Sequence, residues 1–209
     1  MTTKKKIESK LRAIEESIYE LSHKASEALQ LTAEGFNLHS KKHLKDAEKL
    51  AHEVHAGHVV LTDELLNELE NHKEELLQIK KLIPIPGHLE RVGDCCESII
   101  VVTYTKIKEG TLFSDRAVSE INEIFNNTIE LIKSAGDVVL TKNKLLTKHI
   151  ISETENINNK ADDCATMHEE RLILGVCNSK SGSMFLDILD SLQNIALHLK
   201  KIAISASNS

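Results

Sequence analysis

The chain has 209 residues, enough for one domain or two small ones with a sizeable core. It is 41% hydrophobic and 28% charged and contains no Trp, two Pro and eight Gly, a composition that favours long helices over a β fold with many turns. The net charge of −6 argues against a general attraction to nucleic acid. The longest apolar run, SIIVV, is too short to span a bilayer, and no apolar segment of a signal peptide follows the basic start MTTKKK.

Six long periodic segments, separated by turn residues, each predict a helix. The first runs from about residue 5 to 34, and the second from about 44 to 82. The prolines of IPIPG should end the second helix, because proline lacks an N–H group and restricts the residue before it. The third begins near His88 and ends at Gly110, a residue suited to a helix C-terminus.

The second half of the chain continues the pattern. FSDRAVSE opens the fourth helix with Ser114 as the N-cap, since a serine hydroxyl can accept a hydrogen bond from an N–H group of the first turn. The fifth helix should cover about residues 144–176, and CNSKSGS leads into a sixth at about 184–205. The β-branched segment SIIVVTYT lies inside a long apolar ladder, which favours a helix there over a strand.

The two halves of the chain repeat one another. ETENINN matches EVHAGHV at an offset of 100, SLQNIALHLKKI matches HLERVGDCCESI at 103, and TIELIKSAGDVV matches IYELSHKASEAL at 110. A three-helix unit written twice explains these offsets, with residues 1–110 as the first unit and 111–209 as the second. Because the connections are short, neighbouring helices should be antiparallel.

The four cysteines are expected to be reduced packing residues. They show no CxxC spacing, and no secretory context points to disulfides. Cys95 and Cys96 could be soft metal ligands, but adjacent residues of a helix point about 100° apart, which disfavours that function.

Three stretches resemble the PhoU family: HLERVGDCCES, FSDRAVSEI and HEERLILGVCNSKSGSMFLDILDSLQNIA. The sequence is most similar to the PhoU domain associated with bacterial sodium/phosphate cotransporters, and the resemblance covers essentially the whole chain. It implies an all-α fold of two tandem three-helix bundles, with six long antiparallel helices. It also implies a non-enzymatic cytosolic regulator of phosphate uptake, peripheral to the inner face of the membrane.

The resemblance implies partners and a metal site as well. The partner would be a sodium/phosphate cotransporter or an ABC phosphate importer, with a sensor histidine kinase as a further candidate, and family members often form homodimers. In several members, ExxxD-type carboxylates hold iron or another metal on the bundle surface. Here the first half keeps Glu90 and Asp94, but the second half has Gln193 and Leu197, which cannot supply two anionic ligands.

The carboxylates of the third helix can face one way. Glu90, Asp94 and Glu97 fall within about 60° of one another at 100° per residue, and could present several oxygens to Fe, Mn or Zn. The same spacing is also typical of a solvated acidic face, and both interpretations remain open. The opposite side of this helix should face the core, and it carries Leu89, Val92, Cys96 and Ile99.

Histidines of the second helix are candidate partners for these acids. His52, His55 and His58 recur every three residues around Glu53, and imidazoles can complete a mixed site with carboxylates. We single out Glu53, His55 and His58 as further ligands, although the three imidazoles spread over about 120° and should not converge unaided. The spacing excludes the zinc-protease motif HExxH, which needs its histidines four residues apart.

Two other functions are weaker. A diiron centre inside a bundle needs paired Glu-x-x-His motifs, and the chain has a single copy at Glu20 and His23. A histidine phosphotransfer module could use an exposed helical histidine, but His52 and His55 lack the Lys-Gly pair that usually follows. The sequence contains no nucleophile motif, Gly-rich phosphate cradle or P-loop, so we expect no enzyme activity.

Overall fold

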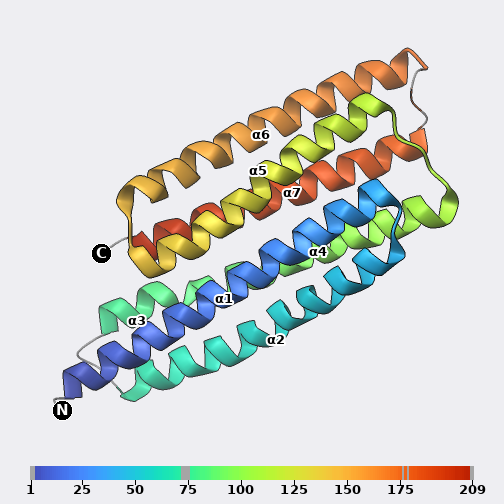
Figure 1. Ribbon diagram of the computed structural model, residues 1–209. Helices are drawn as coiled ribbons and strands as arrows, with labels where there is room; N and C mark the ends of the chain where they lie inside the picture. Colours follow the sequence, from blue (N-terminus) through green and yellow to red (C-terminus); the bar gives the residue numbers. More distant parts are fainter. Residues whose placement is uncertain (1–2, 72–75, 176, 178, 208–209) are drawn as a thin grey trace.

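The computed structural model describes residues 3–71, 76–175, 177 and 179–207, and every regular element in this part of the chain is a helix. The long helices run antiparallel along one axis, with α5, α6 and α7 beside α1, α2 and α4 (Figure 1). The bounds are α1 (Thr3–Leu38), α2 (Lys41–Asn71), α3 (Leu76–Leu82), α4 (Pro84–Glu109), α5 (Asp115–Thr141), α6 (Lys144–Ile173) and α7 (Ser179–Ser207). The prediction of an all-helical chain with six long helices is confirmed, and α3 is a short addition.

Several helix bounds differ from the predictions. The segment expected as one second helix is two, because α2 ends at Asn71 and α3 begins at Leu76; residues 72–75 lie outside the described part. Helix α4 begins at Pro84, before the predicted start at His88, since the first turn of a helix needs no N–H donors and tolerates proline. Helix α7 begins at Ser179, five residues before the predicted start at 184, and the predicted last residue of α6, Val176, is not described.

The predicted caps are present. The Ser114 side chain accepts a hydrogen bond from the Ala117 N–H group at the start of α5. At the end of α4, Gly110 adopts a left-handed conformation with φ of 65°, which glycine reaches without strain. These two signals bound the connection between α4 and α5, where the first predicted unit meets the second.

One hydrophobic core runs through both halves of the chain. Helix α1 packs against α2 and α4, and also against α5 of the second half; α4 packs against α2 and α7. The predicted core face of α4 is confirmed, because Leu89, Val92, Cys96 and Ile99 have no exposed surface. The long segment SIIVVTYT is helical within α4, as predicted. The division into independent units at residue 110 stays a prediction.

A buried lysine braces the turn between α1 and α2. The Lys106 ammonium donates hydrogen bonds to the Phe36 carbonyl at 3.2 Å and to His39 Nε2 at 2.8 Å, and it lies 4.6 Å from the centre of the Phe36 ring. Burial lowers the pKa of Lys106. The contact joins the C-terminal end of α1 to α4, because a cation satisfies carbonyl groups that the helix leaves without a partner.

None of the helices in the described residues has an apolar stretch long enough to cross a bilayer.

Candidate metal site between α2 and α4

Helices α2 and α4 pack antiparallel and bring two rows of side chains together. Histidines of α2 face acidic residues of α4: His52 Nε2 lies 3.6 Å from Glu97 Oε1, and His58 Nε2 lies 3.5 Å from Glu90 Oε2. We call this contact the α2–α4 seam, and its members are His52, His55 and His58 of α2 with Glu90 and Glu97 of α4.

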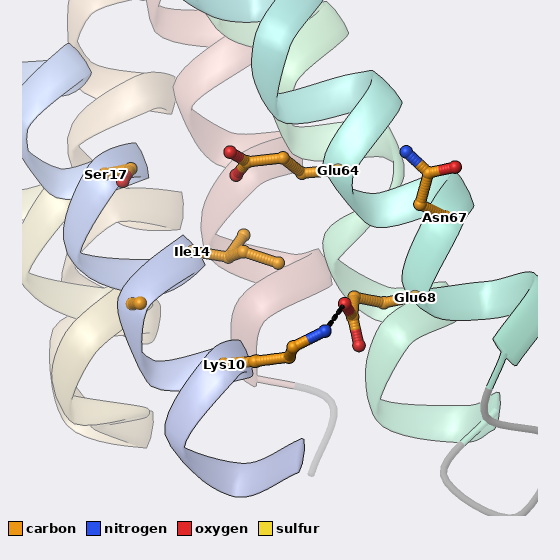
Figure 2. Close-up of a pocket in the computed structure, with 7 residues that line it drawn as sticks. Lys10, Ile14, Ser17, Glu64, Asn67 and Glu68 are labelled. Carbon is orange, nitrogen blue, oxygen red and sulfur yellow. Dashed lines mark hydrogen bonds and ion pairs between the residues drawn. The ribbon is translucent and has the colours of Figure 1, made fainter. Parts of the chain in front are cut away.

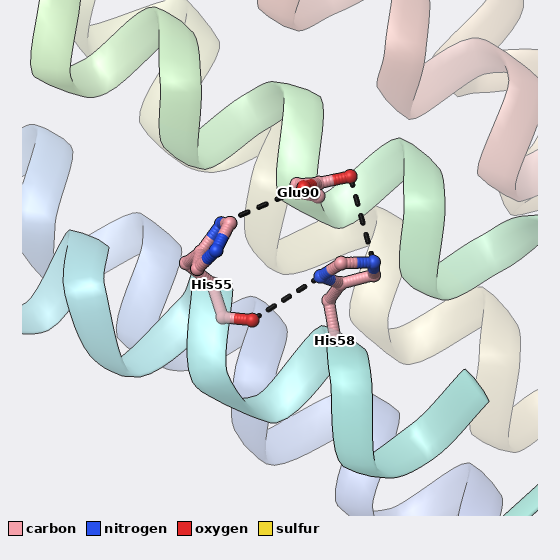
Figure 3. Close-up of side chains that lie close together, drawn as sticks. All are labelled: His55, His58 and Glu90. Carbon is pink, nitrogen blue, oxygen red and sulfur yellow. Dashed lines mark hydrogen bonds and ion pairs between the residues drawn. The ribbon is translucent and has the colours of Figure 1, made fainter. Parts of the chain in front are cut away.

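The centre of the seam is a group of three potential metal ligands (Figure 3). Glu90 points between two imidazoles: His55 Nδ1 lies 3.5 Å from one carboxylate oxygen, and His58 Nε2 lies 3.5 Å from the other. All three potential ligand atoms lie within 4.8 Å of one another. The His58 and Glu90 side chains are 19% and 24% exposed, whereas that of His55 is 61% exposed. The group is therefore open to solvent on the side of His55.

The local sequence explains this convergence. A three-residue spacing places His55 and His58 on neighbouring positions of one helix face. Val54, between them and the core, is fully buried, and it lies in van der Waals contact with the position of a Cβ on Gly93 of α4. This packing of α2 against α4 places Glu90 within reach of both imidazoles.

A backbone contact fixes the proton on His58. Its Nδ1 lies 3.2 Å from the His55 carbonyl oxygen, which can only accept a hydrogen bond. Nδ1 therefore carries the proton, and in the neutral ring the lone pair lies on Nε2, directed at the Glu90 carboxylate. A lone pair facing a carboxylate favours a bound cation between them. Histidine metal ligands commonly have this arrangement, with the other ring nitrogen donating to a carbonyl.

The remaining predicted ligands have other partners. Asp94 accepts a hydrogen bond from the Arg91 guanidinium at 3.0 Å, so these two side chains form an ion pair. Glu53 accepts from Lys24 of α1 at 2.8 Å, and this hydrogen bond lowers the pKa of Glu53. Glu97 lies beside His52, about two turns along α4 from Glu90.

Of the six predicted ligands, Glu90, His55 and His58 thus come together, while Glu53, Asp94 and Glu97 lie beside other residues. The expectation that three histidines would not converge unaided holds in part, since two of them meet at Glu90. His52, which the sequence placed among the candidate histidines but which was not singled out as a ligand, faces Glu97. The signal that could have paired His52 with Glu97 is the order of the residues on two antiparallel helices: His52 precedes His58 on α2, whereas Glu97 follows Glu90 on α4.

The donor set suits a transition metal. Imidazole nitrogens favour ions such as Zn²⁺, Fe²⁺, Ni²⁺ and Cu²⁺, and a carboxylate oxygen adds a negative charge. Three protein ligands leave at least one coordination position for water or another ligand in a tetrahedral or larger coordination shell. The set of His55, His58 and Glu90 therefore fits an exposed metal site with an open face.

A second histidine contact joins the two halves of the chain. His88 Nδ1 of α4 lies 3.2 Å from His198 Nδ1 of α7, so one ring donates to the other. Burial, followed by the neighbouring His88, lowers the pKa of His198 to about 4. Burial, and then Lys201, lowers the pKa of His88. Both rings are thus neutral at neutral pH.

The thiols of Cys95 and Cys96 on α4 have raised pKa values, so they resist deprotonation. Burial, and then the charges of Asp94 and Asp190, raise the pKa of Cys95 to about 11. Cys96 is fully buried, and its pKa is also raised. All four cysteines are free, as predicted.

A separate surface groove lies between α1 and α2 (Figure 2). Its volume is about 400 Å³, and Lys10 of α1 forms an ion pair with Glu68 of α2 across it. Ser17, Glu64 and Asn67 also line the groove, and these residues form no recognisable catalytic arrangement.

Comparisons with known proteins identify the fold. No family model matches the chain, and no curated protein matches its sequence. PhoU from Pseudomonas aeruginosa matches in structure with a TM-score of 0.78 and 16% identity, over 97% of this chain and 94% of that one. The phosphate transport system regulatory protein PhoU from Streptococcus pneumoniae matches with a TM-score of 0.85 and 14% identity, over 96% of this chain and 94% of that one. The chain therefore has the fold of PhoU proteins.

Proposed function

We propose that the protein is a non-enzymatic regulator of phosphate uptake, which acts in the cytosol by docking on a phosphate transporter. The observation that carries the proposal is the agreement in fold along nearly the whole chain with two PhoU proteins. One of them is described as a phosphate transport system regulatory protein. Fold alone does not define function, so the proposal also uses the sequence motifs that resemble this family.

The metal site is part of the proposal. His55, His58 and Glu90 would hold one ion of Fe, Mn or Zn, and Asp94 and Glu97 would add negative charge nearby. The ion would link α2 to α4 and expose an open coordination position to solvent. Its function would be to stabilise this surface or to present it to a partner.

The transporter partner is either a sodium/phosphate cotransporter or an ABC phosphate importer. The motifs favour the cotransporter, for which the chain would be the PhoU domain, whereas the description of the Streptococcus pneumoniae protein refers to a phosphate transport system. A sensor histidine kinase and a second copy of the chain are further candidate partners.

Co-purification tests the proposal and separates the two transporters. The protein, tagged and mixed with detergent-solubilised membranes, should retain one of the transporters, and the amount retained should change between phosphate-rich and phosphate-poor cells. Deleting the protein should alter phosphate uptake in the same cells. Retention of neither transporter, together with unchanged uptake, would refute the proposed function.

A further inference from the structure

Three connections at one end of the molecule expose aliphatic side chains. The turns α1–α2, α4–α5 and α6–α7 all lie at this end, opposite the two chain termini (Figure 1). Leu38, Leu112, Ile173 and Leu174 are 65%, 76%, 86% and 75% exposed there. We call residues 38–45, 108–115 and 173–175 the turn end. Exposed aliphatic residues gathered at one place often mark a contact surface.

The turns hold these side chains outward. A left-handed residue lies in each turn: His39 with φ of 52°, Gly110 with 65° and Gly175 with 70°. In the second turn, the Phe113 ring packs inward against Phe36, with ring centres 5.4 Å apart, and its neighbour Leu112 faces solvent. These exposed aliphatic side chains thus belong to turn segments and do not pack into the core.

Exposed lysines lie close in sequence to these aliphatic residues. Lys41, Lys42 and Lys45 are exposed in the first turns of α2, and Lys108 is exposed at the end of α4. None of these four lysines has an ion-pair partner among the described residues.

The acids at this end are distributed differently. Glu109 pairs with Lys180 at 3.0 Å, and the exposed Asp115, Glu169 and Glu170 belong to α5 and α6. On α2, the exposed Asp46 and Glu48 follow the three lysines and lie farther from the turn. Positive charge thus concentrates beside Leu38 and Leu112, although the whole chain carries −6.

We propose that the turn end binds the surface of an anionic phospholipid bilayer. The aliphatic side chains would enter the boundary between head groups and acyl chains, and the lysines would lie near the lipid phosphates. Charge complementarity favours a membrane as the occupant, because unpaired lysines beside exposed leucines are typical of proteins that bind an anionic interface. The inference goes beyond the proposed function, since it concerns a direct contact with lipid and requires neither metal nor transporter.

Vesicle flotation with the purified chain tests the inference. The protein should float with vesicles of phosphatidylcholine and phosphatidylglycerol but not with vesicles of phosphatidylcholine alone, and added salt should weaken the binding. The triple variant Leu112→Ser, Ile173→Ser, Leu174→Ser should bind the anionic vesicles roughly tenfold or more weakly. The double variant Lys41→Glu, Lys42→Glu should lose binding by a similar factor.

The opposite end of the molecule supplies a matched control. Leu77 and Leu145 are 70% and 76% exposed there, so the variant Leu77→Ser, Leu145→Ser removes similar side chains and should keep wild-type binding. Circular dichroism checks that each variant is folded. Absence of binding to anionic vesicles, or an equal loss in the control, would overturn the inference.

A protein partner is a different outcome of the same variants. If the wild type ignores vesicles but co-purifies with a transporter, and the triple variant does not, the turn end binds protein and the lipid assignment is wrong. If vesicles bind the wild type and no transporter does, the inference stands while the proposed function fails.

Discussion

The α2–α4 seam and its counterpart between α6 and α7 use the same helical packing for different chemistry. At the sequence offsets of 100 and 103, His55 and Glu90 correspond to Glu155 and Gln193. In the second half, Glu155 pairs with Lys200 at 3.6 Å. Gln193 donates hydrogen bonds to the Asn158 carbonyl at 3.3 Å and to Asp162 at 2.9 Å.

The difference lies in which groups still need a partner. In the second half, amide and ammonium donors satisfy the acids across the helix pair. In the first half, the Glu90 carboxylate faces ring nitrogens at 3.5 Å, a contact that is fully favourable only with a proton or a cation present. A few substitutions thus separate a site that can accept a metal from one that is already paired.

A part-buried ion pair between α5 and α6 gives the largest expected effect of any comparison between the halves. Arg171 donates two hydrogen bonds to Glu120, and both side chains are only 11–12% exposed. Burial would raise the pKa of Glu120, but the bonds from Arg171 and Arg116 outweigh it and lower the pKa. Glu120→Ala should reduce the free energy of unfolding by about 2–3 kcal/mol, because it leaves a part-buried guanidinium without the two charged hydrogen bonds that it donates.

The matching position in the first half is the control. The offset of 110 places Lys10 opposite Glu120, and Lys10, whose side chain is 47% exposed, pairs with Glu68. Lys10→Ala should cost less, about 1–2 kcal/mol in urea unfolding, because Lys10 makes a single contact from a half-exposed side chain, although the Glu68 side chain that it leaves is only 11% exposed. Equal costs for the two variants would show that burial does not distinguish them.

Writing the second half's residues into the first should remove the metal. The variant His55→Glu, His58→Asn, Glu90→Gln should bind Zn²⁺ about 100-fold or more weakly than the wild type, as measured by competition with a chelating dye. Asp94→Leu is the control, because Asp94 pairs with Arg91 at 3.0 Å and should be dispensable. If Asp94→Leu abolishes binding as well, the ligand set predicted from the ExxxD motif is the better one.

The reverse exchange should create a second site. Glu155→His, Asn158→His and Gln193→Glu place the first-half residues on α6 and α7, and the metal content should rise from about one to about two ions per chain by elemental analysis. Lys200→Ala can be added, because Lys200 otherwise keeps a positive charge near the new ligands. Unchanged metal content in both variants would mean that the helix spacing differs between the seams.

The histidine pair between the halves should make stability depend on pH. The pKa of His198 is about 4 in the folded protein, against about 6.5 in an unfolded chain. The unfolded state therefore binds the proton more readily, so stability is fully present above about pH 6.5 and falls as the pH decreases toward 4. After solvent screening is allowed for, the loss should be about 1–2 kcal/mol. His198→Gln should flatten the dependence in urea unfolding, whereas the exposed control His149→Gln should not.

The long helices could be predicted because their signals are local. Apolar periodicity, the Ser114 hydroxyl and Gly110 all act within a few residues of the helix ends, and the structure confirms them. The predicted start of α4 at His88 was wrong, because Pro84 and Pro86 were interpreted as the end of the preceding helix, although the first turn of a helix accepts proline.

The candidate site could be predicted only in part. Helical spacing places Glu90 and Asp94 on one face, but it does not reveal that Asp94 turns toward Arg91. The convergence of His55 and His58 on Glu90 depends on the register between α2 and α4. Register between helices distant in sequence is set by core packing, which a single sequence does not show.

The direction of the last helix also makes a circular permutation of the chain possible. Because the long helices alternate in direction and are even in number, α1 begins and α7 ends at the same end of the molecule (Figure 1). Joining these ends by a flexible linker and opening the chain between α4 and α5 would give a circular permutant with the two halves in reversed order. Such a chain keeps every helix contact while changing which half is synthesised first. Its folding would therefore reveal whether residues 1–110 and 111–209 act as interchangeable units.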